Sequence, residues 1–393
     1  MIYACSSYHH PYPIYIRHFI ISFHILGSTT IQLQSKALRE YLKLDGYEMA
    51  FHRKKELGNS TRDTCGQIEG GNQINLAICF FSEKLSPMPD NTKCSRRECH
   101  PDLLHYASEI AERNRNIFIS AEFLGGINVN GVNRLAKFIL PQWEHHTIVI
   151  FYRRYYDLIV SQHNQNYKTR TLSDTKHWER SILDFVSDRI KHVPNNYVTK
   201  LEERLRTKFH NVVVMNFHDW SHGGPQGSLF CDPTLNMTHT CEALMKEKET
   251  PHTNGAVNLD YSDLAYAARQ AGLITIESNE RMKQVSQEVK RHHIHTLDGN
   301  TNPFQRVCPT KEDLDTLLNM SVEYEMKYFP ENVDELKDGF EKLSSTKLCK
   351  IDVDATLEKK EWRDFFIALE KKASSESGTK TKAKKDSTKK KNV

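Results

Sequence analysis

The most informative stretch of the sequence for the fold is His146-Thr-Ile-Val-Ile-Phe-Tyr-Arg153-Arg154-Tyr-Tyr-Asp157-Leu-Ile-Val-Ser161. Its first part, Thr147–Arg153, is a short apolar run rich in β-branched residues, which is typical of a strand buried on both faces. An amphipathic pattern begins near Tyr156 and carries Ser161 about one and a half turns into a helix. A guanidinium at a strand end and a hydroxyl on the next helix can bind one phosphate from two sides, so the stretch predicts an anion site. A surface ion pair between Arg153 and Asp157 is the alternative.

Further apolar runs of the same kind alternate with amphipathic helical patterns, which predicts a mainly parallel sheet with helices on both faces. From about Asp260 onward the pattern is helical only. We therefore expect an α/β domain over residues 15–260, a helical C-terminal portion over 261–372 packed on it, and a disordered lysine-rich tail over 373–393. The predicted strands are Phe19–Leu26, Asn116–Leu124, Thr147–Arg153, Asn211–Phe217 and, with a weaker pattern, Ile74–Ser82.

The composition is ordinary for a soluble globular protein with much solvated helix surface. Of its 393 residues, 26% are charged, and the mean hydropathy is −0.62. The formal charge of +4 arises in the tail, because Gly378–Val393 holds seven lysines and one aspartate and the rest of the chain is close to neutral. Such a tail can bind nucleic acid or acidic lipid, but solvated disordered ends are commoner, so we expect no nucleic-acid partner.

A second anion-binding element follows the first predicted strand, in Phe23-His-Ile-Leu-Gly27-Ser28-Thr29-Thr30-Ile-Gln32. Gly27 lets the backbone approach a ligand closely, and Ser28 and Thr29 can donate hydroxyl hydrogen bonds. The helix that starts here presents free N–H groups to an anion. Simple capping of that helix by Ser28 or Thr29 explains the same residues equally well.

Taken together, the two elements resemble the sulfotransferases that use 3′-phosphoadenosine 5′-phosphosulfate (PAPS). In that family a strand–Gly-Ser-Thr-Thr–helix loop holds the 5′-phosphosulfate, and an Arg-x7-Ser pair after a later strand holds the 3′-phosphate. The resemblance covers roughly residues 19–250 and is stronger to the Golgi-type carbohydrate and glycolipid branch. It implies a P-loop-type parallel sheet, PAPS as sulfonate donor without a metal, and these nucleotide-binding residues: Gly27, Ser28, Thr29, Thr30, Arg153 and Ser161.

One departure from the family pattern concerns catalysis. The family loop usually begins Lys-Thr, whereas this chain has Ile25-Leu26. The lysine neutralises the leaving phosphate, and losing such a cation removes stabilisation on the order of a few kcal/mol from the transition state. Three explanations are an amino terminus joined to the wrong exon, a binding protein without catalysis, or substitution of the lysine by His24 or Arg17. We favour the first, because the family pattern returns abruptly at Gly27.

Transfer of a sulfonate to a hydroxyl also needs a base near the acceptor oxygen. Glu122 is our candidate because Asn116–Leu124 carries it to the carboxyl end of a predicted strand. His24 is the competing candidate. The expected acceptor is a hydroxyl of a glycan or glycolipid, and nothing in the sequence identifies it further or fixes the oligomeric state. The other function classes are a catalytically impaired binding protein and a P-loop kinase or NTPase, which the missing Gly-x4-Gly-Lys-[Ser/Thr] motif disfavours.

The cysteines and the amino terminus bear on the compartment. Cys231 and Cys241 frame a turn-rich stretch that can close a small disulfide loop, and Asn236 inside it belongs to a glycosylation sequon. The resemblance implies the Golgi lumen or another secretory compartment. Ile14–Leu26 is too short and too polar for a transmembrane segment, and no leader is visible, so the cytoplasm stays the alternative.

Overall fold

A computed structural model of the chain describes residues 18–23, 31, 34–35, 37–49, 108, 110–113, 115–121, 127–167, 171–173, 178, 180–194, 197–246, 259–296 and 304–373. It divides into two compact units. The first unit comprises Met1–Arg153 and Pro194–Asn254, and the second comprises Arg154–Val193 and Gly255–Val393. Each unit is described by itself below.

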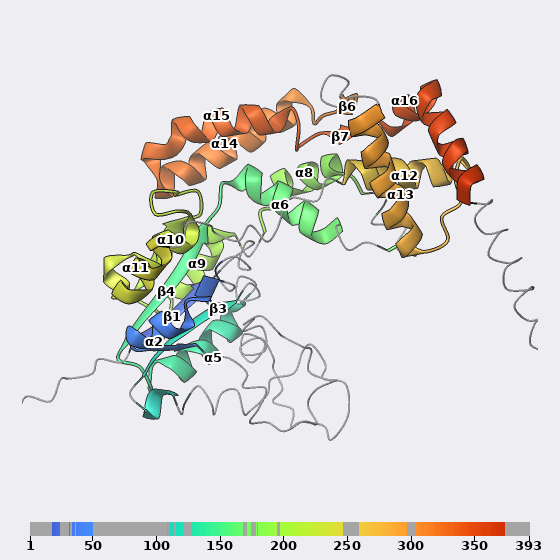
Figure 1. Cartoon of the computed structure of the whole chain (residues 1–393). Coiled ribbons are helices and arrows are strands. Elements are labelled where there is room, and N and C mark those ends of the chain that lie inside the picture. The colour runs from blue at the N-terminus through green and yellow to red at the C-terminus, as the bar shows by residue number, and fades with distance from the viewer. Residues whose placement is uncertain are drawn as a thin grey trace, which may run out of the picture. The chain divides into compact units, whose positions relative to one another are not determined.

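The first unit contains a five-stranded sheet in the order β2-β3-β1-β4-β5, and every neighbouring pair in it is parallel (Figure 1). The predicted mainly parallel sheet is thus confirmed. Four strands fall on predicted apolar runs, whereas the three-residue edge strand β2 is too short to leave a pattern in the sequence. The predicted strand Ile74–Ser82 lies outside the described residues. The strands are β1 (His18–Phe23), β2 (Tyr47–Met49), β3 (Asn116–Ala121), β4 (His145–Tyr152) and β5 (Val212–Asn216).

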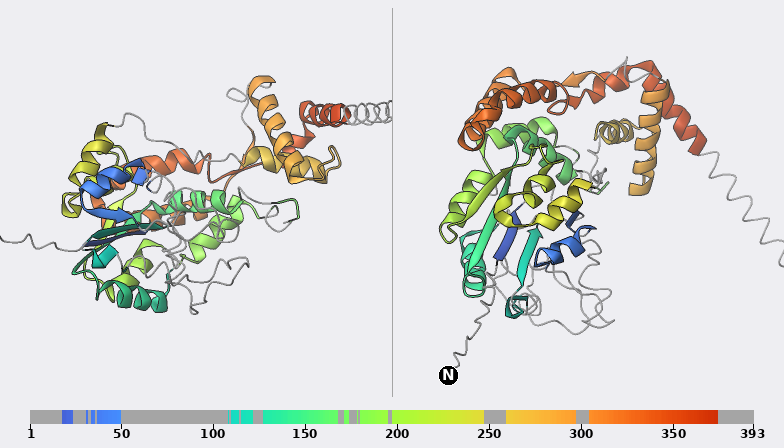
Figure 2. Two further views of the ribbon diagram at one scale, coloured as in Figure 1. Left: turned by 60° about the horizontal axis from the view of Figure 1, so that its bottom comes forward. Right: turned by 60° about the vertical axis from the view of Figure 1, so that its left-hand side comes forward.

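Helices cover both faces of this sheet. Alternate residues of each central strand point to opposite sides, so apolar side chains on both faces have to be buried. Phe118, Val149 and Phe151 are buried on one face with residues of α2, α10 and α11. The views in Figure 2 agree with this grouping and show α5 and α9 on the other face. The helices of this unit are α2 (Arg39–Leu44), α5 (Val129–Ile139), α9 (Val198–Arg206), α10 (Pro225–Phe230), η3 (Pro233–Leu235) and α11 (Thr238–Lys246).

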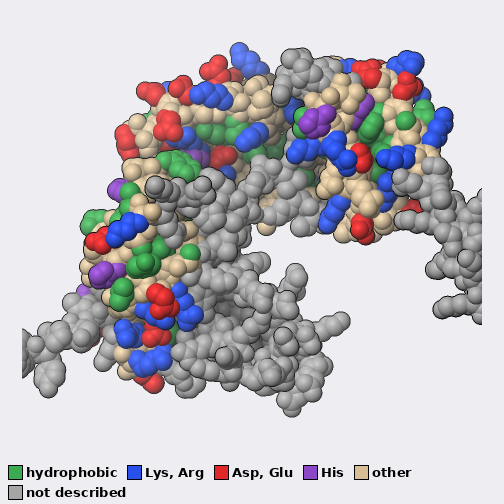
Figure 3. Space-filling view, viewed as in Figure 1, with side chains coloured by type: hydrophobic (Ala, Val, Ile, Leu, Met, Phe, Trp, Pro, Cys, Tyr) green, Lys and Arg blue, Asp and Glu red, His purple; other side chains and the backbone are tan. Residues whose placement is uncertain are grey.

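The second unit consists mainly of helices, which form two groups. The first group packs α6 (Tyr155–Tyr167) and α8 (Ile182–Lys191) on the hairpin of α14 (Lys311–Tyr328), η5 (Pro330–Asn332) and α15 (Val333–Ser344). Charged side chains of both signs cover the visible surface of α14 and α15 (Figure 3), which accounts for part of the high charged fraction. The second group holds α12 (Asp260–Gln270), α13 (Asn279–Arg291), η4 (His292–Thr296), α16 (Val353–Glu358) and a helix over residues 360–373.

The border between the units differs from the predicted border at residue 260. Residues 154–193 belong with the C-terminal helices, since α6 packs on α14 and α15 through its first turn. The ring of Tyr155 lies edge-on to that of Tyr324 at 5.5 Å, and the Tyr156 hydroxyl donates to the carbonyl of Leu336 at 3.3 Å. These contacts join segments far apart in the sequence, so no local pattern could have placed this border.

A two-stranded antiparallel sheet of β6 (Arg306–Val307) and β7 (Lys350–Ile351) links the helices of the second unit. A disulfide between Cys308 and Cys349 fastens the two strands together. In the part of the chain that the structure describes, no helix is both long and apolar enough to cross a membrane.

Candidate nucleotide-binding site

The candidate site lies at the carboxyl edge of the sheet in the first unit, between β1 and β4. These two strands are parallel neighbours, and Phe23 at the end of β1 pairs with Ile150 of β4. From β1 the chain continues to β2 on one side of the sheet, and from β4 it continues to β5 on the other. Chain connections that leave in opposite directions open a crevice between the strand ends, which is where open α/β sheets bind ligands. Both predicted anion-binding elements follow these two strands.

The loop Gly27–Thr30 follows β1 in the sequence but lies outside the described residues, as do His24 and Ile25. Its predicted contacts with a phosphosulfate therefore stay a prediction. The register of β1 with β4 shows only that this loop begins at the same sheet edge as Arg153.

Arg153 directly follows β4, whose last six residues are buried. Its guanidinium carbon lies 5.0 Å from the centre of the Phe217 ring, over the ring. Phe217 is itself held beside β4, because its backbone N–H donates to the carbonyl of Tyr152 at 2.8 Å. A cation over the face of an aromatic ring is attracted to that ring, so Phe217 helps to hold Arg153 beside the end of β4.

Arg154 has a different role from Arg153, although the sequence presents them as a pair. Its side chain is only 6% exposed and lies in the second unit, 3.1 Å from a carboxylate oxygen of Glu335 and 3.6 Å from one of Glu325. Burial lowers the pKa of Arg154, but the neighbouring Tyr156 and the two glutamates outweigh burial and raise it above its ordinary value. Arg154 is therefore a structural cation that ties the start of α6 to α14 and α15.

Ser161 is half-buried on α6 and belongs to the second unit, whereas Arg153 is the last residue of its segment of the first unit. Each of the two residues is thus described within its own unit. The buried face of α6 is formed by Tyr155, Tyr156, Leu158, Ile159, Val160, His163 and Tyr167.

The candidate base Glu122 follows β3 in the sequence and lies outside the described residues, as does the competing candidate His24. The strand that precedes Glu122 is central in the sheet: Ala121 at the end of β3 pairs with Phe23 at the end of β1. Ser120, one residue earlier in β3, is fully buried. The register therefore starts the Glu122 segment at the same edge as the anion-binding loop.

The turn after β5 adds polar residues to this edge that the sequence reading missed. Asp219 accepts a hydrogen bond from the backbone N–H of Ser221 at 2.9 Å and one from the Ser228 hydroxyl at 3.2 Å. The hydrogen bonds from Ser221 are the main reason why the pKa of Asp219 lies below its usual range. The signal that could have revealed this turn is Gly223-Gly224 before Pro225, since both glycines have a positive φ.

Cys231 and Cys241 form a disulfide within the first unit. It connects the end of α10 to α11, and both helices pack on the sheet. The bridge thus fixes the segment that follows the β5 turn.

No family model and no curated protein matches the chain. Among solved structures, the chain is similar to a sulfotransferase from Alicyclobacillus acidocaldarius, with 13% sequence identity and a TM-score of 0.30, over 69% of this chain and 96% of that chain. A TM-score of this size does not establish a common fold, so the site rests on the strand order and on the residues themselves.

Chemically, the described part of this edge presents the guanidinium of Arg153, which lies over an aromatic ring, and a hydrogen-bonded acidic turn. The strand order brings to the same edge the sequence positions of a hydroxyl-rich loop and of a carboxylate. A guanidinium and a hydroxyl-rich loop suit two phosphate groups of one ligand, and a carboxylate suits proton removal from a hydroxyl.

Proposed function

We propose that this protein binds an adenosine 3′,5′-bisphosphate at the carboxyl edge between β1 and β4, and that it is a sulfotransferase using PAPS as donor. The observation that carries the proposal is the strand order, in which the two strands preceding the anion-binding elements are parallel neighbours at a topological switch point. Arg153 would hold the 3′-phosphate, and Gly27–Thr30 would hold the 5′-phosphosulfate. The compartment that we propose is the Golgi lumen or another part of the secretory pathway.

The proposed reaction moves a sulfonate from PAPS to a hydroxyl of a glycan or glycolipid. A bond forms between the acceptor oxygen and sulfur, the bond from sulfur to the 5′-phosphate oxygen breaks, and the acceptor proton passes to Glu122 or His24. Ser28 and Thr29 would donate hydrogen bonds to the sulfonate and the leaving phosphate. Because Ile25 stands where the family has lysine, nucleotide binding is the better supported half of the proposal.

Binding of 3′-phosphoadenosine 5′-phosphate, measured by calorimetry without magnesium, tests the site. Arg153→Ala removes a charge-assisted contact worth about 1.5–3 kcal/mol, so the Kd should rise roughly 10- to 150-fold. The matched control is Arg115→Ala, because Arg115 precedes β3 at the opposite edge of the sheet and its side chain is half exposed. Unchanged affinity in Arg153→Ala, or equal losses in the two variants, would overturn the assignment.

Two further measurements separate the function classes. ATP binding that requires magnesium, without binding of the bisphosphate, would instead indicate a kinase or NTPase. If the bisphosphate binds, the variant Ile25→Lys shows whether catalysis is merely impaired. Sulfonate transfer that appears only in this variant would mark the natural chain as a binding protein with the sulfotransferase site.

A further inference from the structure

The second unit contains a cavity of about 440 Å³ that the proposed nucleotide site does not use. It lies among α6, α8, α12 and the β6–β7 sheet, and its volume falls in the range of roughly 300–1,000 Å³ that small-molecule sites occupy. All of its lining residues belong to the second unit. A ligand of the size of one or two sugar rings is therefore the scale to consider.

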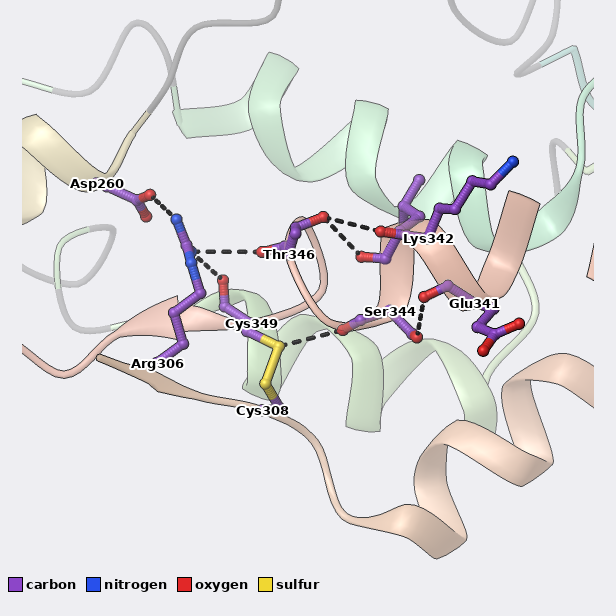
Figure 4. Close-up of a disulfide and its surroundings, with 9 residues drawn as sticks. Asp260, Arg306, Cys308, Glu341, Lys342, Ser344, Thr346 and Cys349 are labelled. Atoms are coloured by element: carbon purple, nitrogen blue, oxygen red, sulfur yellow. Dashed lines mark hydrogen bonds and ion pairs between the residues drawn. A yellow bond between two sulfur atoms is a disulfide. The ribbon is translucent and has the colours of Figure 1, made fainter. Parts of the chain in front are cut away.

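One wall of the cavity is fixed by Arg306 and the neighbouring disulfide (Figure 4). The guanidinium of Arg306 lies 2.5 Å from a carboxylate oxygen of Asp260 and donates to the carbonyls of Thr346 and Cys349 at 3.3 and 3.2 Å. Cys349 is bonded to Cys308. Because Arg306 has a carboxylate partner and two carbonyl acceptors, it shapes the wall and contributes little net charge.

Three further basic side chains line the cavity, namely Arg180, Lys347 and Lys350. With Arg306 they make four basic residues against two acidic ones, Asp260 and Asp263, so the lining has a net positive charge. Arg180 lies 3.3 Å from Asp188, and its side chain is 46% exposed. An ion pair of this exposure is weak, so exchanging Asp188 for an anionic ligand would cost Arg180 little.

The field of these cations acts on Asp184, in the first turn of α8 beside the cavity. Burial raises the pKa of Asp184, but hydrogen bonds from the side chain and backbone of Ser181, and then the charges of Lys350 and Arg180, outweigh burial and hold it below its ordinary value. Ser181 and Asp184 form a capping box that satisfies the first N–H groups of α8. Because these N–H groups already have partners, an anion in the cavity would have to be bound by side chains.

An aromatic pair supplies part of the apolar lining. The rings of Trp178 and Tyr266 are stacked, with centres 4.4 Å apart and planes 5° apart. The indole N–H of Trp178 donates to the carbonyl of Thr171 at 3.0 Å, which fixes the ring. Aromatic side chains offer a rigid apolar surface on which the C–H faces of a sugar ring can pack.

We propose that this cavity binds an acidic saccharide, which is a glycan segment carrying a carboxylate or a sulfate. The cations suit the acidic group. The carboxylates of Asp260 and Asp263, together with Asn164 and Ser181, suit the many hydroxyl donors of a sugar. Two carboxylates in the lining disfavour a phosphate-dense nucleotide, which offers few hydroxyls to them. Saccharide binding at this cavity does not depend on the proposed function.

The test uses the full chain and two disaccharides that differ in one group: glucuronic acid β1,4-linked to glucose, and glucose β1,4-linked to glucose. Calorimetry at low ionic strength should give a Kd at least about 10-fold lower for the acidic disaccharide. In the double variant Lys347→Gln, Lys350→Gln this preference should fall to about 3-fold or less, with binding of the neutral disaccharide unchanged. The matched control is Lys342→Gln, since Lys342 lies on neighbouring α15 and does not line the cavity.

The outcomes separate this inference from the proposed function. Equal affinity for the two disaccharides, no binding of either, or an unchanged preference in the double variant would each overturn the inference. Loss of 3′-phosphoadenosine 5′-phosphate binding in the double variant would overturn it too, by making the cavity a nucleotide site. If the acidic disaccharide binds as expected while the bisphosphate does not bind at all, the cavity stands and the sulfotransferase function falls.

Discussion

Removing the buried partner of Arg154 should destabilise the second unit strongly. Glu325 lies on α14 with a side chain that is 0% exposed, and Arg154 is 6% exposed, so their mutual attraction is little screened by water. The third member, Glu335, is 67% exposed although it is the nearer partner, at 3.1 Å. In Glu325→Ala the guanidinium stays buried, and the carboxylate that remains beside it, that of Glu335, is largely solvated.

The expected cost follows from burial and not from distance. Breaking a buried ion pair by removing one member costs about 3–5 kcal/mol, because an uncompensated charge stays in the interior. Truncating an exposed member costs about 0–1 kcal/mol, so Glu335→Ala is the matched control. For a unit of this size 1 kcal/mol corresponds to about 2–4 °C, so calorimetric unfolding of the second unit should shift by roughly 6–20 °C in Glu325→Ala.

A further variant distinguishes an uncompensated charge from a packing defect. Arg154→Met combined with Glu325→Leu replaces the buried pair by apolar side chains of similar volume, and it should be near neutral or stabilising. The reasoning is refuted if Glu325→Ala costs no more than Glu335→Ala, or if the double variant is as unstable as the single one.

Three smaller predictions test other parts of the fold. Asp184→Ala removes a capping-box member and should cost about 1 kcal/mol of unfolding free energy at neutral pH. Because the pKa of Asp184 is lowered in the folded state, this stabilisation is present above about pH 4 and is lost as the pH falls below that value. A cost that persists undiminished at pH 2 would contradict the assignment. The loss of chain entropy in the unfolded state makes a disulfide more stabilising when it closes a longer loop, and the two disulfides have sequence separations of 10 and 41. Cys231→Ser should therefore cost about 2.7 kcal/mol and Cys308→Ser about 3.9 kcal/mol. The reverse order in thermal unfolding would argue against this ranking. Gly227→Ala should abolish the folded first unit by circular dichroism, because the added methyl would overlap the backbone carbonyl of His222, and a soluble, folded variant would show that the β5 turn is adaptable.

The candidate site was predicted from the sequence only as far as its segments. Arg153 and the loop Gly27–Thr30 were selected because each follows an apolar run, and the sheet brings those two runs together as β1 and β4. The separate roles of Arg153 and Arg154 were out of reach. Their difference depends on Phe217, Glu325 and Glu335, which local spacing does not connect to either arginine.

By itself, the sequence determined the elements whose signal is local. Runs of β-branched residues marked four of the five strands of the parallel sheet, and the helical pattern after Asp260 marked the region of the C-terminal helices, because each such pattern is set by residues close together in the chain. Short elements such as β2 and α10 lacked the length for a pattern. The missing lysine at Ile25 is likewise a property of the sequence alone, and it separates nucleotide binding from catalysis in the proposed function.

Which distant residues meet depends on the tertiary structure. It set the strand order, joined residues 154–193 to the C-terminal helices, paired Cys308 with Cys349, and assembled the cavity beside Arg306. A similar case is Asp45, whose carboxylate accepts the backbone N–H groups of His239 and Thr240 at the start of α11. The physical reason is that burial, ion pairing and capping depend on which groups exclude water around one another, and that is settled when the whole chain packs.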